Sequence, residues 1–167
     1  MEYVKVEEII FKGKQNIKWD EVEEYIKRYM GEVYIVKEYN DYIHFNMISA
    51  DEFSSSSYTA KLKGGLAKTK ANIATIIPEL IENATNRRWV DNKNAKHDKN
   101  ALRGWYRYDV FFDMPVKAEG EEYVRWNNYY ATMIVRINDE GLFFYDIINI
   151  KKERSAYPAR IILMTTR

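Results

Sequence analysis

The sequence predicts an α+β fold, with one or two helices packed on an antiparallel sheet, and two patterns support that prediction. Between Leu66 and Ala84, apolar residues recur at helical spacing. From Leu102 onward, apolar and polar residues alternate, as they do in strands that bury one face. Because the two patterns occupy separate parts of the chain, we expect a meander of three or four strands covered by helices.

An acidic unit made of a helix and a hairpin is predicted ahead of this body. Asp20 and Glu23 have the spacing of a capping box, and the apolar residues after them predict a helix over residues 20–30. Two β-type runs, at residues 32–37 and 42–47, predict a hairpin.

A long loop is predicted over residues 48–65, which include four consecutive serines and lack apolar periodicity. We place a boundary in this loop, with residues 1–53 as an accessory extension and residues 54–167 as the main α+β domain. We expect the two to form one compact unit. In the helix that follows, Pro78 predicts a kink, or a stop with a short second helix starting at the proline.

The strand predicted over residues 102–114 has an apolar face and a polar face. Tyr108 and the apolar residues in step with it form the first face, which we expect in the core. Arg103, Trp105 and Arg107 form the second face.

A hairpin is predicted to complete the meander. Residues 129–137 alternate in the same way, and the run Asn138-Asp139-Glu140-Gly141 is typical of a type I turn followed by a left-handed glycine. We therefore expect residues 142–150 to return alongside, and a last short strand over residues 160–165.

The expected turn also fixes the cross-strand neighbours in this hairpin. If residues 139–141 form the loop, Ile134 lies opposite Asp146. Asp146 then lies diagonal to Arg136, on the face away from the apolar row. We therefore expect this carboxylate among the polar side chains of the sheet.

The composition limits the available chemistry. At 167 residues, 46% apolar and 31% charged, the chain has the profile of a soluble globular domain. No apolar run approaches the roughly 20 residues of a membrane helix, and the amino terminus lacks a secretory pattern, so we expect a cytoplasmic protein without a membrane partner. The chain has no cysteine and has His44 and His97 as its two histidines. These counts exclude thiol chemistry and HExxH zinc sites, and we expect no cofactor and no metal, with a carboxylate magnesium site left open.

Charge is unevenly distributed behind a net charge of +1. Residues 1–60 carry 7 basic and 12 acidic side chains, residues 61–107 carry 11 and 4, and residues 108–167 carry 8 and 9. A concentrated basic middle is typical of proteins that bind phosphate backbones. The alternative is a solvated face whose lysines pair with the acidic first third.

Several residues of the basic middle are candidate phosphate ligands. Lys68 lies just after Gly64-Gly65 at a predicted helix start, where free N–H groups favour anions. The order differs from a P-loop because Ala67, not glycine, precedes the lysine, so a plain glycine turn is the favoured interpretation. Arg87 and Arg88 join Lys68 as candidate contacts to nucleic acid.

Residues 92–109 combine His97 with basic and aromatic side chains. Metal-independent RNA cleavage needs a base for the ribose 2′-hydroxyl, an acid for the leaving oxygen and cations for the phosphorane charge. Histidine, arginine, lysine and tyrosine meet these needs. The alternative is a solvated histidine, with arginines that pair with Asp109 or Asp146.

Five short motifs lie between about residues 55 and 155: Tyr58 to Gly64, Lys68 to Asn72, Lys96 to Ala101, Gly104 to Asp109, and Phe144 to Glu153. Together they resemble nuclease-like domains of phages and mobile elements, which are grouped with the barnase, EndoU, colicin and RelE fold. The resemblance implies an amino-terminal helix, a four-stranded antiparallel sheet, and metal-independent endoribonuclease activity on the exposed sheet face. It also implies three catalytic candidates, His97, Arg107 and Lys70.

Two functions are compatible with these observations. The first is RNA binding with cleavage, in which Arg103, Arg107 and Arg136 hold phosphates, His97 acts as acid or base, and Trp105 stacks a base. The second is a non-catalytic phage-encoded binding protein or inhibitor of a host nucleic-acid or defence system. Its acidic first third would contact a host or phage protein. Convergence of the histidine and the arginines in one cleft favours the first function.

Overall fold

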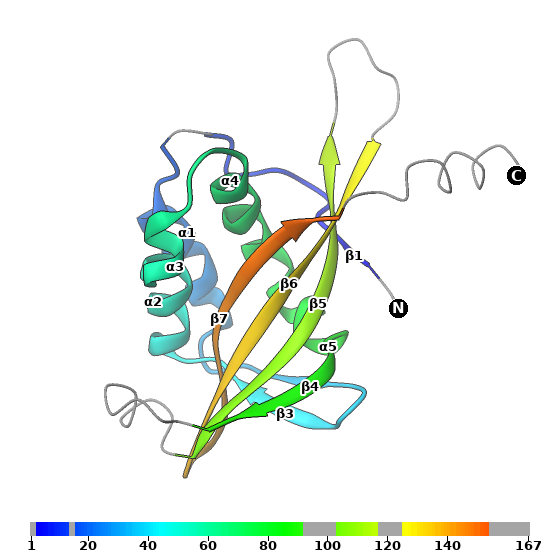
Figure 1. The fold of residues 1–167 in the computed structure, drawn as a ribbon. Helices are drawn as coiled ribbons and strands as arrows, with labels where there is room; N and C mark the ends of the chain where they lie inside the picture. The colour runs from blue at the N-terminus through cyan, green and yellow to red at the C-terminus, as the bar shows by residue number, and fades with distance from the viewer. Residues whose placement is uncertain (1–2, 14–15, 92–102, 117–124, 154–167) are drawn as a thin grey trace, which may run out of the picture.

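A computed structural model describes residues 3–13, 16–91, 103–116 and 125–153, which form a layer of helices on one face of a curled sheet (Figure 1). The strands follow the order β1-β5-β6-β7-β3-β2, and β4 also pairs with β5. They are β1 (Val4–Lys5), β2 (Val33–Val36), β3 (Asp41–His44), β4 (Thr85–Val90), β5 (Gly104–Val116), β6 (Arg125–Asn138) and β7 (Gly141–Lys152).

The predicted four-stranded antiparallel sheet is wrong, because the described sheet has seven strands and mixed pairing. β5, β6 and β7 form the expected antiparallel meander. β3, however, pairs parallel to β7, and β1 pairs parallel to β5. Alternation in a sequence shows which face of a strand is buried but not which strand lies at its edge. The hairpin of β2 and β3 was therefore predicted, but its pairing with β7 was not. The predicted strand at residues 160–165 lies outside the described residues.

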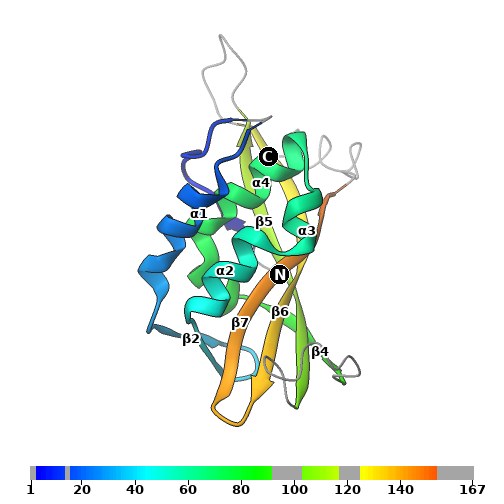
Figure 2. The same ribbon diagram turned by 90° about the vertical axis from the view of Figure 1, so that its left-hand side faces the viewer.

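The helices lie on one side of the sheet, and Figure 2 shows α1, α2 and α3 in front of it. They are α1 (Trp19–Ile26), α2 (Met47–Ser55), α3 (Ser57–Lys61), α4 (Gly64–Ile73) and α5 (Ile77–Glu82), with single 3₁₀ turns at residues 27–29 and 74–76. We call the side of the sheet that they cover the helix side, and the opposite side the outer face. The predicted boundary between residues 53 and 54 falls within α2.

The predicted loop at residues 48–65 is also wrong, because α2 and α3 occupy most of it. Asn46 caps α2 by accepting the N–H of Ser49, and Ser49 Oγ accepts the N–H of Asn46. Ser56 caps α3 by accepting the N–H of Thr59 at 3.2 Å. The Asn46 amide oxygen and the serine hydroxyl groups accept free amides at the helix starts, so the serine-rich stretch builds helices instead of interrupting them.

The helical stretch that follows breaks as the proline predicts. α4 ends at Ile73, a 3₁₀ turn follows, and Pro78 lies in the first turn of α5. This confirms the second alternative, a stop and a new short helix at the proline. Asn72, buried in α4, accepts the N–H groups of Ile10 and Phe11 and thereby fixes the amino-terminal segment to the helices.

The core lies between the helices and the meander. The alternating residues of β5 and β6 are buried there as predicted, including Tyr108, Val110 and Met133. The rings of Phe45 and Phe144 stack at 5.3 Å, which joins the segment after β3 to β7. The outward residues of the same strands are therefore left for the outer face.

Strand β7 contains a bulge that the sequence did not indicate. Val135 pairs with Phe144 and Ile134 pairs with Asp146, so Tyr145 is an extra residue in the ladder. The turn is one residue shorter than expected, because Asn138 pairs with Gly141. We call this irregularity the β7 bulge.

The curl of the sheet brings the β2–β3 turn to β4 (Figure 1). Asp41 accepts Arg87 Nη1 at 2.8 Å and the Tyr108 hydroxyl at 2.7 Å. Thr85 Oγ1 donates to Glu38 at 2.8 Å. These contacts hold the edge hairpin against the first strand after the helices.

Candidate nucleic-acid interface

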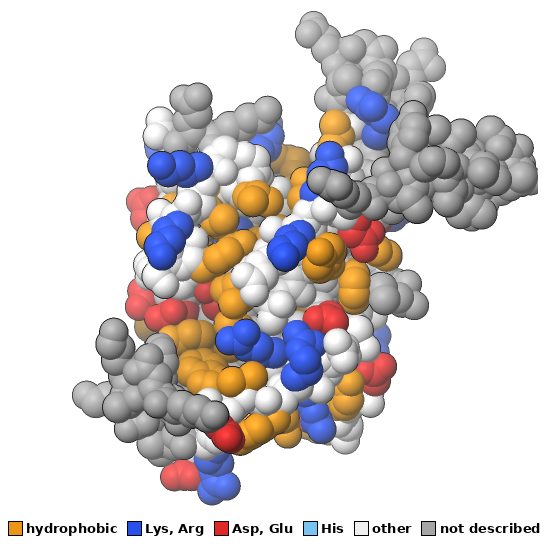
Figure 3. Space-filling view, in the orientation of Figure 1, with side chains coloured by type: hydrophobic (Ala, Val, Ile, Leu, Met, Phe, Trp, Pro, Cys, Tyr) orange, Lys and Arg blue, Asp and Glu red, His pale blue; other side chains and the backbone are white. Residues whose placement is uncertain are grey.

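A row of side chains crosses the outer face near the β6–β7 turn. Pairing places Phe143 beside both His44 of β3 and Arg136 of β6, and Trp105 of β5 on the other side of Arg136. Arg107 and Arg88 lie opposite one another in β5 and β4, in the adjacent row. We define the outer-face cluster as Arg88, Trp105, Arg107, Arg136 and Phe143, together with Tyr145, which contacts Trp105. Figure 3 shows lysine and arginine side chains beside hydrophobic ones over these central strands.

Aromatic rings pack against Arg136 and Trp105 of the cluster. The Arg136 guanidinium lies 4.5 Å from the Phe143 ring centre, and the His44 ring lies 5.3 Å from the same ring. Trp105 meets Tyr145 edge-on at 4.7 Å. Arg136 is 2% exposed, and this burial lowers the pKa of its guanidinium below the usual value. Arg136 therefore belongs to the base of the cluster, whereas Trp105 is half-buried at its surface.

The two remaining arginines differ in their partners. Arg88 pairs with Asp109 at 3.1 Å, and Asn86 donates to the other oxygen of this carboxylate at 2.8 Å. Arg107 Nε is buried and has no hydrogen-bond acceptor within the described part of the chain. A buried donor without an acceptor is costly, so this position on the outer face favours an acceptor from outside the described residues.

Two predicted arginines lie away from the cluster. Arg103 pairs with Asp139 at 3.0 Å, with both side chains largely exposed at the β6–β7 turn. Arg87 lies between the rings of Tyr39 and Tyr106, 4.5 and 4.4 Å from their centres, and binds Asp41. The structure thus gives these two cations carboxylate partners at the edge of the sheet.

The predicted lysines lie on the helix side. Lys70 is fully buried, and its Nζ donates to Asp146 at 2.6 Å and to Thr59 Oγ1 at 2.5 Å. Burial lowers the pKa of Lys70 and raises that of Asp146, and each charge opposes the shift of the other. Lys68, on the same helix, is half-buried and also lies away from the outer-face cluster.

The expected position of Asp146 is therefore wrong. It was placed near Arg136 on the polar face, and Ile134 does lie opposite it. The turn is one residue shorter than expected, so Leu142, Phe144 and then Asp146 alternate onto the helix side, where Asp146 meets Lys70. A change of one residue in a turn is enough to reverse the side on which the residues after it lie.

The structure brings Trp105, Arg107, Arg136 and Arg88 together, and His97 lies outside the described residues. Sequence reasoning missed Phe143 and Tyr145. Both belong to an uninterrupted apolar run from residue 142 to 145, so alternation could not assign their faces. His44, in the predicted hairpin strand over residues 42–47, lies against Phe143.

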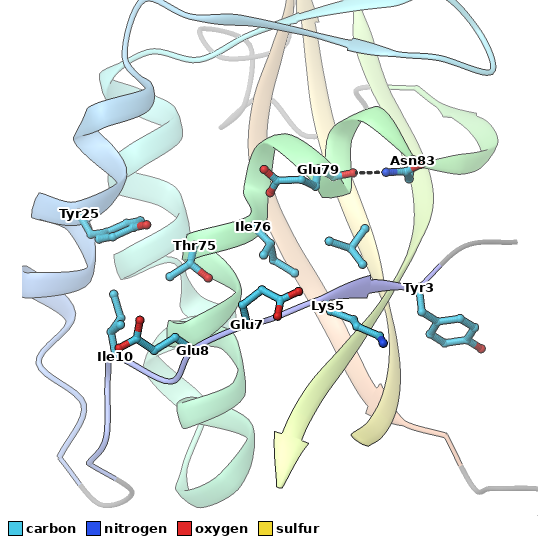
Figure 4. Close-up of a pocket in the computed structure, with 11 residues that line it drawn as sticks. Tyr3, Lys5, Glu7, Glu8, Ile10, Tyr25, Thr75, Ile76, Glu79 and Asn83 are labelled. Carbon is cyan, nitrogen blue, oxygen red and sulfur yellow. Dashed lines mark hydrogen bonds between the residues drawn. The ribbon is translucent and has the colours of Figure 1, made fainter. Parts of the chain in front are cut away.

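A groove of about 700 Å³ lies on another part of the surface, between β1 and the stretch from α4 to α5. Figure 4 shows side chains from the amino-terminal segment, α1 and this stretch around it. Glu7, Glu8 and Glu79 give it an acidic rim. It contains none of the predicted site residues, and the predicted protein partner of the acidic first third stays a prediction.

The described residues provide no metal-ligating cluster of three or more histidine, aspartate or glutamate side chains. Among the described helices, none has the length and apolar character needed to cross a membrane. No protein-family model, curated protein or solved structure matches the chain. The resemblance to nuclease-like domains therefore stays a prediction that rests on the short motifs alone.

Proposed function

We propose that this protein binds single-stranded RNA through the outer-face cluster. The observation that carries the proposal is Arg107, whose buried Nε has no hydrogen-bond acceptor in the described part of the chain. A phosphate oxygen supplies that acceptor and neutralises the guanidinium. Among the described residues of the ladders at this end of the face are three arginines, Arg88, Arg107 and Arg136, and one aspartate, Asp109, which pairs with Arg88. The positive charges of these four residues therefore outnumber the negative one.

Trp105 supports the single-stranded character of the ligand. Its ring lies in the row next to Arg107 and is held edge-on by Tyr145. An aromatic ring beside a cation is the usual arrangement for an unpaired base next to its phosphate. A duplex would keep its bases stacked on one another and leave Trp105 without a partner.

Lys70 has no part in the proposed contact, because it is fully buried on the helix side with Asp146. The proposal is therefore one of binding. The cleavage implied by the family resemblance is a separate question, which His97→Ala and Arg107→Ala address when bound RNA is inspected for breaks.

The experiment is a fluorescence-anisotropy titration of labelled oligouridylate between about 50 and 200 mM salt. We expect binding that weakens as salt rises, and an Arg107→Ala protein whose affinity falls at least about tenfold, by the loss of one charge-assisted contact. Its salt slope should fall by about 0.7, the contribution of one phosphate on a single strand. Arg28→Ala removes the same charge from exposed Arg28 and should match the wild type.

Equal affinity of the Arg107→Ala and Arg28→Ala proteins would contradict the proposal. Binding of duplex RNA or single-stranded DNA as tightly as oligouridylate would contradict the assignment to single-stranded RNA. Cleavage of the bound RNA that both His97→Ala and Arg107→Ala abolish would add nuclease activity to binding.

A further inference from the structure

The β7 bulge and the Lys70–Asp146 pair share one carboxylate oxygen. Asp146 Oδ1 accepts the backbone N–H of Ile147, two residues after the extra residue Tyr145, at 2.8 Å. The same oxygen accepts Lys70 Nζ at 2.6 Å. One carboxylate oxygen therefore hydrogen-bonds both to the β7 backbone beside the bulge and to the Lys70 side chain of α4.

The pair is enclosed by groups from α2 and α3. Lys70 Nζ also donates to Thr59 and lies 4.7 Å from the ring centre of Phe53, and the Ser56 hydroxyl hydrogen-bonds to the Asp146 carboxylate. The side chains of Lys70 and Asp146 are 0% and 3% exposed. Lys70 Nζ thus has two acceptors inside the fold, and Asp146 Oδ1 accepts from both Lys70 and Ile147.

Stability alone does not explain such a pair. Apolar residues of similar volume often stabilise a fold as well as a buried ion pair does, whereas charged groups accept very few alternative positions. A strand with one extra residue is open to such alternatives, because moving the bulge by one position exchanges the faces of neighbouring side chains. The residue next to Asp146 is Tyr145, which meets Trp105 on the outer face.

We propose that Lys70 and Asp146 are a positioning pair that holds the β7 bulge in the register that places Tyr145 against Trp105. The consequence for RNA affinity rests on the proposed function, whereas the register itself does not. The pair acts through the strand, on the side opposite to the ligand. It explains why a lysine in a motif predicted to be catalytic lies in the core.

The test compares three proteins by NMR, with the contact between the Trp105 indole and the Tyr145 ring as the readout. In the wild type we expect one set of Trp105 resonances and a nuclear Overhauser effect to Tyr145. In Lys70→Met/Asp146→Leu, which keeps apolar volume, we expect a folded protein with a second set of Trp105 resonances or a lost effect. Lys70→Met/Asp146→Asn retains an acceptor for the Ile147 amide and should show the same change to a smaller extent. A folded double variant with the single wild-type pattern would overturn the proposal.

Amide exchange in the wild type keeps the proposal testable if the variants do not fold. The Ile147 N–H should exchange as slowly as that of core residue Met133, and exchange as fast as that of turn residue Gly141 would overturn the proposal. RNA affinity of the folded double variant should fall at least threefold. If the wild type binds no RNA, the proposed function fails, while the Trp105–Tyr145 contact still decides the positioning role.

Discussion

The two faces of the central strands hold cations in opposite settings. On the helix side, Lys70 is buried with Asp146, and its Nζ donates to Asp146 and Thr59 inside the fold. On the outer face, Arg107 has a buried Nε with no acceptor within the described part of the chain. Both residues were predicted to act on RNA. A cation with internal partners contributes to the fold, whereas a buried donor without an internal acceptor favours a partner from outside, as in the proposed RNA contact of Arg107.

The largest effect should come from breaking the internal pair. Lys70→Ala leaves the Asp146 carboxylate buried without its counter-charge, so we expect the free energy of unfolding to fall by about 3–5 kcal/mol in urea titrations. Lys68→Ala, at a half-buried position of the same helix, should change it by less than about 0.5 kcal/mol. Similar losses of unfolding free energy in Lys70→Ala and Lys68→Ala would contradict the stabilising role of the Lys70–Asp146 pair.

Removal of the outer-face aromatic should weaken binding more than it weakens the fold. Trp105→Ala removes the proposed stacking surface, so we expect affinity for oligouridylate to fall roughly 5- to 100-fold, from about 1–3 kcal/mol of stacking. Trp89 is a matched control, because it lies opposite Tyr106 on the other face of the same strand pair and is 49% exposed. Equal losses of affinity for Trp89→Ala and Trp105→Ala would contradict the assignment of RNA binding to the outer face.

Tyr108 provides a test on the helix side through its response to alkali. Burial, and then its hydrogen bond to Asp41, raise the pKa of Tyr108 above the usual value near 10. Above pH about 10 the unfolded chain loses this proton while the folded chain keeps it, so stability falls by about 1.4 kcal/mol per pH unit. Below that pH both states hold the proton and this contribution is constant.

Tyr108→Phe should remove this part of the alkaline slope. At neutral pH we expect the variant to lose about 1 kcal/mol of stability with the hydrogen bond to Asp41. Between about pH 10 and 11, its stability should fall less steeply than that of the wild type. Tyr42→Phe, at a position 52% exposed, is the control and should keep the wild-type slope. An unchanged slope in Tyr108→Phe would contradict the burial of this hydroxyl.

The smallest effect is expected at the edge of the outer face. Arg103 and Asp139 are 65% and 71% exposed, and such surface pairs contribute little to stability. Arg103→Ala should leave the urea midpoint unchanged within error and reduce RNA affinity far less than Arg107→Ala. A loss equal to that of Arg107→Ala would extend the binding surface to the β6–β7 turn.

The parts of the fold that could be predicted are those determined by residues that are neighbours in the sequence. Alternation identified the buried face of β5 and β6, and Pro78 identified the break before α5, because both depend on neighbouring residues. The parallel pairing of β3 with β7 depends on contacts between distant segments, which no local pattern encodes. β4 was missed because Asn86, with a positive φ of 53°, interrupts its ladder inside a polar stretch.

The same distinction applies to the candidate interface. Trp105, Arg107 and Arg136 were predicted on one face because each lies in a regular part of its strand. The side on which Asp146 lies was wrong because the turn from which alternation was counted is one residue shorter than expected. The partners of Lys70 were likewise hidden, since they come from α3 and β7.

If a phosphate oxygen accepts the Nε–H of Arg107 when RNA binds, the side-chain Nε–H resonances of the arginines report it. On addition of oligouridylate to the wild-type protein, we predict that the Arg107 Nε–H resonance shifts and exchanges more slowly with water, because it gains an acceptor. The resonances of Arg28 and of Arg87, already paired with Asp41, should stay in place. Saturating RNA that leaves the Arg107 resonance unmoved, or that moves Arg28 equally, would contradict the account.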